Sequence, residues 1–194
     1  RQQRMNYDID IWSRGVDRDI FDPSQRDMEW RRGLAIADNT PVIGFLGRLV
    51  MEKGLDVFSD AIDQLRRRKV PHQVMVIGDG PARPWFETRI PDAKFVGFQV
   101  GSDLGRAVAS MDMFFNPSVT EAFGNVTLES MASGLPVVAA KATGSQSLVE
   151  DKVSGRLITP GAINQFTDAL QAYCVDEDLR TKHGAAGEQR SLDY

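Results

Sequence analysis

Residues 41–80 read PVIGFLGRLVMEKGLDVFSDAIDQLRRRKVPHQVMVIGDG, and this stretch decides the fold class. It holds an apolar run over 41–47, an amphipathic segment over 55–68 and a second apolar run over 73–78. Short continuous apolar runs are typical of strands buried on both faces, whereas apolar residues at i, i+3 and i+4 predict a helix. A strand, a helix and a strand at this spacing predict a right-handed crossover and a parallel sheet.

The same alternation continues along the rest of the chain. It predicts one α/β domain with a doubly wound, Rossmann-like parallel sheet of about six strands. Ligands of such sheets bind beyond the carboxyl ends of the strands, so the loops that follow the strands are the ones to inspect. The further predicted strands are 93–97, 113–116, 136–140 and 155–159, and the further predicted helices are 84–89, 103–110, one from 125 stopped by Gly134, 163–175 and one from 178.

The composition excludes several classes of protein. The 194 residues carry 23 Lys and Arg against 27 Asp and Glu, a net charge of −4, which argues against a nucleic-acid binder. A single cysteine, Cys174, excludes a disulfide framework and a cysteine-built zinc site. Because there is no membrane-length apolar run and no signal peptide, we expect a cytoplasmic protein, with peripheral contact at the inner face of the membrane left open.

The two ends of the chain suggest a domain of a longer protein. Residues 7–12 alternate polar and apolar like a strand, and the polar, helix-like sequence at Tyr194 has met no stop signal. We therefore expect residues 1–24 to be a lead-in strand and loop from a preceding domain. Residues 25–194 would be the main domain, with its last helix truncated.

The loop after the first strand carries two cations. Gly47 lets the backbone approach a ligand closely, while Arg48 and Lys53 stand before a helix N-terminus, where anions are stabilised. A guanidinium fork and an ammonium suit a diphosphate. The alternative is that both are surface charges, with Lys53 paired to Glu52 or Asp56.

The loop after the fourth strand carries two carboxylates. Glu121 and Glu129 lie on either side of a Gly-Asn turn, in which Asn125 is the predicted N-cap of the next helix. Carboxylates there can accept hydrogen bonds from sugar hydroxyls, close to the cations of the first loop. The alternative is two exposed acids that stabilise a helix start.

The loop after the second strand, Gly78-Asp-Gly-Pro81, resembles the start of a dinucleotide-binding fingerprint. Arg83 stands where the third glycine should be, and no acidic residue ends a suitable strand, which disfavours a nicotinamide-binding domain. A tight turn with Pro81 initiating a helix is the favoured interpretation.

Together these motifs resemble the nucleotide-sugar-binding half of retaining GT-B glycosyltransferases of the family 4 (group 1) type. The resemblance spans roughly residues 9–188, with its motifs in the correct order. The motifs are Ser13-Arg-Gly-Val-Asp17, Phe21-Asp-Pro23, Gly47-Arg-Leu49, Glu52-Lys-Gly54, Gly78-Asp-Gly-Pro81, Glu121 with Glu129, and Ala132-Ser-Gly-Leu-Pro-Val-Val138.

The resemblance implies a role for each matched position. Arg48 and Lys53 would clamp the donor diphosphate and stabilise the leaving group, and Glu121 would contact the transferred sugar. Glu129 would bind the ribose, and Gln99 would lie beside the base. Backbone N–H groups around Phe123, Gly124, Asn125 and Val126 would bind sugar or phosphate. The backbone at Gly47 would also contact the donor.

The implied enzyme uses no metal and no cofactor, and transfers a mannose- or glucose-type hexose from a UDP- or GDP-sugar to a lipid or glycan acceptor. Its own N-terminal domain would supply the acceptor site, so this domain alone should bind nucleotide and turn over nothing. The rivals left open are a non-catalytic nucleotide-binding or regulatory module and a GT-B phosphorylase or epimerase.

The remaining features favour structural roles. His72 and His183 are predicted to be surface residues, and Cys174 is predicted to belong to the core. The basic run at residues 66–69 is predicted to be a solvated helix end, with contact to anionic lipid or a neighbouring domain as the alternative.

Overall fold

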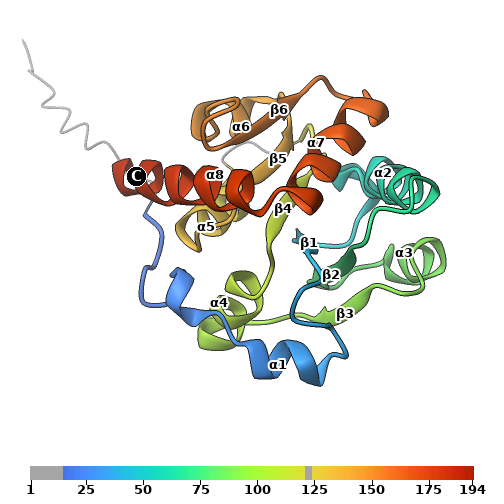
Figure 1. Cartoon of the computed structure of the whole chain (residues 1–194), viewed down its shortest axis with the longest axis horizontal. Coiled ribbons are helices and arrows are strands. Elements are labelled where there is room, and N and C mark those ends of the chain that lie inside the picture. The colour runs from blue at the N-terminus through green and yellow to red at the C-terminus, as the bar shows by residue number, and fades with distance from the viewer. Residues whose placement is uncertain (1–14, 121–123) are drawn as a thin grey trace, which may run out of the picture.

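The computed structural model of the chain describes residues 15–120 and 124–194. Within them, the strands form one all-parallel sheet in the order β3-β2-β1-β4-β5-β6 (Figure 1). The strands are β1 Val42–Leu46, β2 Gln73–Ile77, β3 Lys94–Gly97, β4 Met113–Asn116, β5 Val137–Ala140 and β6 Gly155–Ile158. The predicted doubly wound α/β fold is confirmed, and the six strands predicted from residue 41 onward agree with the structure to within a residue at each end.

Helices connect the strands and cover both faces of the sheet. They are α1 Met28–Gly33, α2 Leu55–Arg67, α3 Arg83–Arg89, α4 Gly101–Ala109, α5 Asn125–Ala132, α6 Thr143–Leu148, α7 Ile163–Val175 and α8 Glu177–Arg190, with short 3-10 turns η1 Pro23–Gln25, η2 Met51–Lys53 and η3 Ser191–Asp193. None of the helices in the described ranges is long and apolar enough to cross a membrane.

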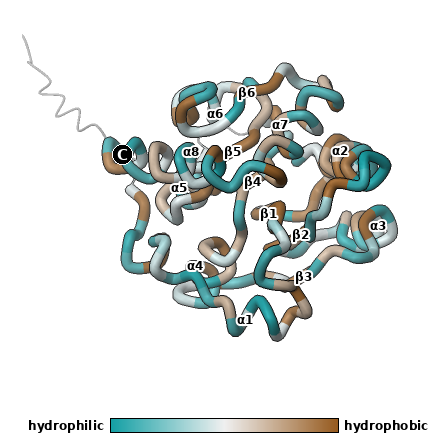
Figure 2. The backbone as a smooth tube through the Cα atoms, viewed as in Figure 1, coloured by the Kyte–Doolittle hydropathy of each residue, from teal (hydrophilic) through white to brown (hydrophobic). Residues whose placement is uncertain are grey.

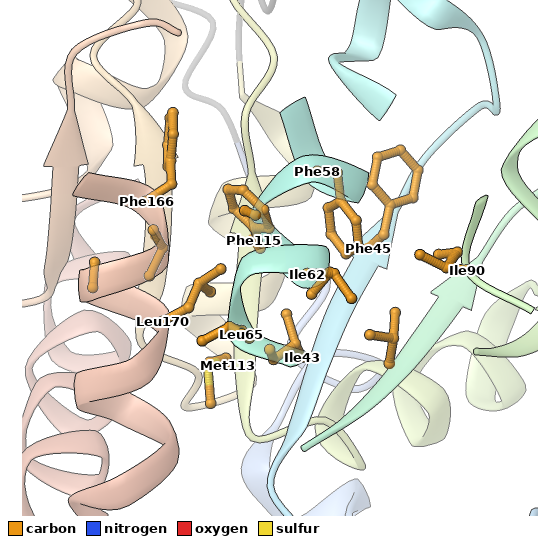
Figure 3. Close-up of a cluster of buried hydrophobic side chains, with 14 of the residues drawn as sticks. Ile43, Phe45, Phe58, Ile62, Leu65, Ile90, Met113, Phe115, Phe166 and Leu170 are labelled. Atoms are coloured by element: carbon orange, nitrogen blue, oxygen red, sulfur yellow. The ribbon is translucent and has the colours of Figure 1, made fainter. Parts of the chain in front are cut away.

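One face of the sheet packs against α2, α3 and α7. The apolar stripe of α2 turns toward the sheet and its polar side turns away (Figure 2), which is what the i, i+3, i+4 spacing predicts. In this core Phe58 and Ile62 of α2 lie over Phe45 of β1, and Phe166 and Leu170 of α7 extend it past β4 (Figure 3). Burial of these side chains is the main favourable term for the fold.

The other face packs against α4, α5 and α6. Their buried residues join those of the strands, and Phe21 of the lead-in and Ile36, which follows α1, belong to the same second core. The part of the lead-in that the structure describes therefore packs into the domain. The strand predicted over residues 7–12 lies outside the described residues.

Two helices were not predicted. α1 begins after Asp27, whose carboxylate accepts a hydrogen bond from the backbone N–H of Trp30, an N-cap within a segment for which no element was predicted. α6 has no apolar periodicity, and it packs against α5 with Leu148 in the second core. The helix predicted over 84–89 is confirmed as α3, with Pro84 in its first turn, whereas Pro81 lies in the turn before the helix and does not initiate it.

His183 corrects the prediction of a surface histidine. It is buried between α7 and α8, and its Nδ1 lies 2.7 Å from the hydroxyl oxygen of Tyr173. Burial lowers the pKa of His183, because the charged imidazolium is disfavoured away from water. His72 is only half-buried.

Cys174 packs partly buried against the first core, in agreement with its predicted role. Burial raises the pKa of its thiol to about 12, so the group is an inert, protonated core residue.

The basic run at the end of α2 is largely neutralised within the domain. Arg66 pairs with Asp63 and Asp92, and Arg68 pairs with Asp168 of α7. These pairs support the prediction of a solvated helix end with a structural role over that of a lipid-binding patch.

Candidate functional site

The loops that follow β1 and β2 are joined by backbone hydrogen bonds at the carboxyl edge of the sheet. The N–H of Gly47 donates to the carbonyl of Ile77 at 3.0 Å, and the N–H of Leu49 donates to the carbonyl of Asp79 at 2.9 Å. Arg48 lies between these two bonds and is exposed. The backbone on both sides of this cation is therefore fixed.

Glycines make this contact between loops possible. A Cβ on Gly78, whose φ is +130°, would lie 2.0 Å from the carbonyl oxygen of Gly47. A Cβ on Gly80 would lie 2.4 Å from the carbonyl oxygen of Leu49. The Gly-x-Gly pattern thus serves close backbone packing, which supports the structural interpretation over a dinucleotide fingerprint.

Lys53 is half-buried at the end of η2, directly before Gly54. Gly54 adopts the left-handed conformation, with φ of 73°, and begins α2 as its N-cap. A Cβ on Gly54 would lie 3.2 Å from Pro117, so this turn is packed against the loop that follows β4. The second cation therefore lies where the loops after β1 and β4 meet.

The N-cap of α5 is Gly124 and not Asn125, which corrects the prediction. Gly124 has a φ of 71°, and Asn125 is the first helical residue, with no side-chain capping bond. A Cβ on Gly124 would lie 2.9 Å from Leu148 and 3.0 Å from the carbonyl of Gly144, so α6 closes in behind this turn. The first turn of α5 still directs N–H groups toward the carboxyl edge.

A cavity of about 470 Å³ opens at this edge, between the loops after β1, β2 and β3 and the helices α4 and α5. Its wall is mainly apolar, with a few polar groups at defined points, as is usual for sites that bind small molecules. It is lined by Leu46, Gly47, Arg48, Ile77, Gly78, Asp79, Phe98, Gln99, Leu104, Val126 and Glu129.

Glu129 is a half-buried carboxylate that lines this cavity. It lies in the second turn of α5, and desolvation raises the pKa of its side chain. No hydrogen bond or ion pair to the side-chain carboxylate of Glu129 occurs within the parts of the chain that the structure describes. A carboxylate in an apolar wall is ready to accept hydrogen bonds from the hydroxyls of a ligand.

Gln99 and Phe98 line the cavity from the loop that follows β3. The Gln99 side-chain Nε2 donates to the carbonyl of Val96 at 2.6 Å, which holds the amide in place and leaves its Oε1 as an acceptor. Phe98 is 75% exposed, an unusual fraction for a phenylalanine. The pair offers an aromatic face and a fixed polar atom side by side.

The structure brings five of the predicted site residues to one cavity. These are Gly47, Arg48, Gln99, Val126 and Glu129. Lys53, Gly124 and Asn125 lie on the neighbouring turns but do not line it. Glu121 and Phe123 lie outside the described residues, so their predicted roles stay predictions.

Sequence reasoning missed the apolar wall of the cavity. Leu46 and Ile77 end their strands and Leu104 lies on α4, and each was interpreted only as part of a strand or helix. Their position at the carboxyl ends of buried strands, or one turn into the following helix, is the signal that identifies them. Asp79, in the turn after β2, was also missed.

Comparison with known proteins points to one family. The family model described as "Glycosyl transferases group 1" matches residues 40–176. The chain is 34% identical over 191 residues to the sulfoquinovosyl transferase SQD2 of Arabidopsis thaliana, which covers 95% of this chain and 36% of that protein. It is 36% identical over 169 residues to a GDP-mannose-dependent alpha-mannosyltransferase of Mycobacterium tuberculosis (strain CDC 1551 / Oshkosh), covering 87% of this chain and 43% of the relative.

Two solved structures share the fold. Anabaena HepE, in complex with UDP and glucose, matches with a TM-score of 0.80 at 28% identity, covering 92% of this chain and 51% of the other. The C-terminal domain of a group 1 glycosyl transferase (LpcC) of Francisella tularensis matches with a TM-score of 0.80 at 25% identity, covering 92% of this chain and 97% of the other.

The chain spans a third to a half of the length of these two curated relatives. The matched segment nevertheless runs from the start of the first core strand to the end of α7, and so includes every described loop of the cavity. The chain belongs to the group 1 family of glycosyltransferases.

Proposed function

We propose that this chain is the donor-binding domain of a glycosyltransferase that transfers a hexose from a nucleotide-diphosphate sugar to a lipid or glycan acceptor. The observation that carries the proposal is the convergence of Arg48, Gln99 and Glu129 on one cavity at the carboxyl edge. An acceptor for a base, a carboxylate for ribose hydroxyls and a cation for a diphosphate thus line the same cavity, and base, ribose and diphosphate are the three parts of a nucleotide.

The chemistry follows from where charge develops. Breaking the bond between the sugar and the diphosphate places negative charge on the departing oxygen. Arg48 and Lys53, together with the N-terminus of α5, would stabilise that charge without a metal ion. We propose retention of the anomeric configuration, with the leaving phosphate assisting removal of the acceptor proton.

The relatives differ in the nucleotide that their names or structures give, so experiment has to identify the sugar and the base of the donor. One group of them is named as GDP-mannose-dependent, whereas HepE was solved with UDP and with UDP-glucose. A mannose- or glucose-type donor with GDP or UDP is therefore the proposed substrate class, and an N-terminal domain of the full-length protein would carry the acceptor site.

Calorimetric titration of this chain with UDP, GDP and ADP in the absence of divalent metal tests the proposal. We expect one nucleotide to bind preferentially and Arg48→Ala to weaken that binding, because the guanidinium loses its contact with the diphosphate. Arg67→Ala, which removes an exposed arginine of α2, is the matched control and should bind like the parent chain. Absence of binding by all three nucleotides would contradict the proposal.

The affinity for the preferred nucleotide should fall as the pH is lowered from 7 toward 5. Burial raises the pKa of Glu129 in the free protein, whereas ribose hydroxyls donate to its ionised form. Binding therefore favours loss of the Glu129 proton, and it weakens as the pH drops through the raised pKa.

Glu129→Gln separates this effect from protonation of the diphosphate itself. The variant should bind about tenfold more weakly at pH 7, since a neutral acceptor replaces a charged one. It should also show a shallower pH dependence than the parent chain. Parallel pH profiles for the two proteins would exclude Glu129 as the titrating group.

A further inference from the structure

A buried asparagine at the end of β4 joins α5, a helix that lines the donor cavity, to the loop that follows β4. Asn116 is almost fully buried. Its Nδ2 donates to Oγ1 of Thr127 in α5 at 3.3 Å, and its Oδ1 accepts from the backbone N–H of Ser118 at 3.2 Å. One amide thus donates a hydrogen bond to the helix and accepts one from the loop.

Two hydroxyls extend this connection to the loop after β1. The hydroxyl of Thr120 donates to the carbonyl of Glu52 at 3.3 Å. Oγ of Ser118 lies 3.2 Å from Oγ1 of Thr120 and accepts from the backbone N–H of Thr120 at 3.3 Å. Because the Thr120 proton is directed to Glu52, the Ser118 hydroxyl is the donor to Thr120.

This series of hydrogen bonds ends near Glu129 on one side and near Lys53 on the other. Thr127 belongs to α5, the helix that carries Glu129, and Glu52 precedes Lys53 in η2. The series of hydrogen bonds therefore links α5, which carries Glu129, to η2, which carries Lys53. The close packing of Gly54 against Pro117 supports the same junction.

We propose that Thr120 is a positioning residue that fixes the distance between Glu129 and Lys53. The inference rests on the proposed function, because it concerns how one ligand reaches both groups. A nucleoside diphosphate must contact the carboxylate through its ribose and the cation through its diphosphate, so it depends on their separation. The binding of a ligand that contacts only one of the two groups does not depend on that separation.

This difference between ligands supplies the test. The chain is titrated with the nucleoside diphosphate that it prefers, with the matching nucleoside and with inorganic pyrophosphate. Thr120→Val keeps the shape of the side chain and removes the hydrogen bond. We expect Thr120→Val to lower the affinity for the nucleoside diphosphate about three- to tenfold, which is the contribution of one hydrogen bond. The affinities for the nucleoside and for pyrophosphate should change little.

Two further variants separate positioning from general weakening of the fold. Thr120→Ser keeps the hydroxyl and should restore the affinity of the parent chain. Thr88→Val removes another exposed threonine hydroxyl, one that donates to the carbonyl of Pro84 within α3, and should change nothing.

The outcomes are distinct. An equal loss for all three ligands, or no loss for any, would overturn the positioning role while leaving the proposed function intact. A parent chain that binds no nucleoside diphosphate would instead overturn the proposed function, and this inference with it.

Discussion

Lys53→Ala in the full-length protein is expected to abolish glycosyl transfer, with a loss of about a hundredfold or more, the scale seen when one preorganised transition-state donor is removed. Lys53 lies at the end of η2, where Gly54 turns the chain into α2. This turn neighbours the cavity, and in the proposed function the ammonium stabilises the diphosphate as negative charge builds on it. The measurement is the rate of transfer from a sugar donor that carries the nucleotide preferred in the calorimetric titration.

The kinetic signature separates this role from simple binding. A cation that acts mainly on the departing diphosphate should lower kcat more than it raises KM. Lys182→Ala, an exposed lysine of α8, is the matched control, and its thermal unfolding and turnover should equal those of the parent. Near-normal turnover of a folded Lys53→Ala variant would refute the proposed role of Lys53 in stabilising the diphosphate.

The strand and helix pattern could be predicted because periodicity is a local signal. β4 and α7 occur over the residues predicted for them, since each is a clear apolar run or a helical stripe. α6 has no such signal: the sequence Thr143–Leu148 contains few good helix formers, and contacts with α5 decide its structure.

Burial of polar groups could not be predicted from the chain. α8 is polar along most of its length, so nothing local indicates that His183 turns inward to Tyr173. Likewise Arg48 and Glu129 were found because each follows a strand at the carboxyl edge, whereas the bonds of Asn116 depend on how α5 packs against β4.

A fully buried arginine is the most consequential case of this kind. Arg31 of α1 donates to Oδ2 of Asp112 at 2.9 Å and to the carbonyls of Ser110 and Thr40. Asp112 also pairs with Arg26 at 2.6 Å and accepts from the backbone N–H of Val42, the first residue of β1. About 80 residues separate the partners, so no sequence pattern marks them.

Asp112→Ala should therefore destabilise the domain by about 3–5 kcal/mol, the cost of leaving a buried charge without its partner. Denaturant unfolding of the parent and variant chains measures this free energy. The cavity lies at the opposite edge of the sheet, since Asp112 precedes β4 and bonds to the start of β1. The fraction of the variant that is folded should consequently bind nucleotide as the parent does.

Two comparisons decide whether the buried charge is the cause. Asp38→Ala breaks the exposed pair with Arg32 and should leave the unfolding free energy nearly unchanged, because solvent screens that pair. Replacing Arg31 and Asp112 together by leucine should cost less than Asp112→Ala alone, since the partly exposed Arg26 is then the charge that loses its partner, and the fully buried charge of Arg31 is gone. If Asp112→Ala were as stable as Asp38→Ala, Arg31 would not need its charged partner, and its hydrogen bonds to the carbonyls of Ser110 and Thr40 would be enough to satisfy it.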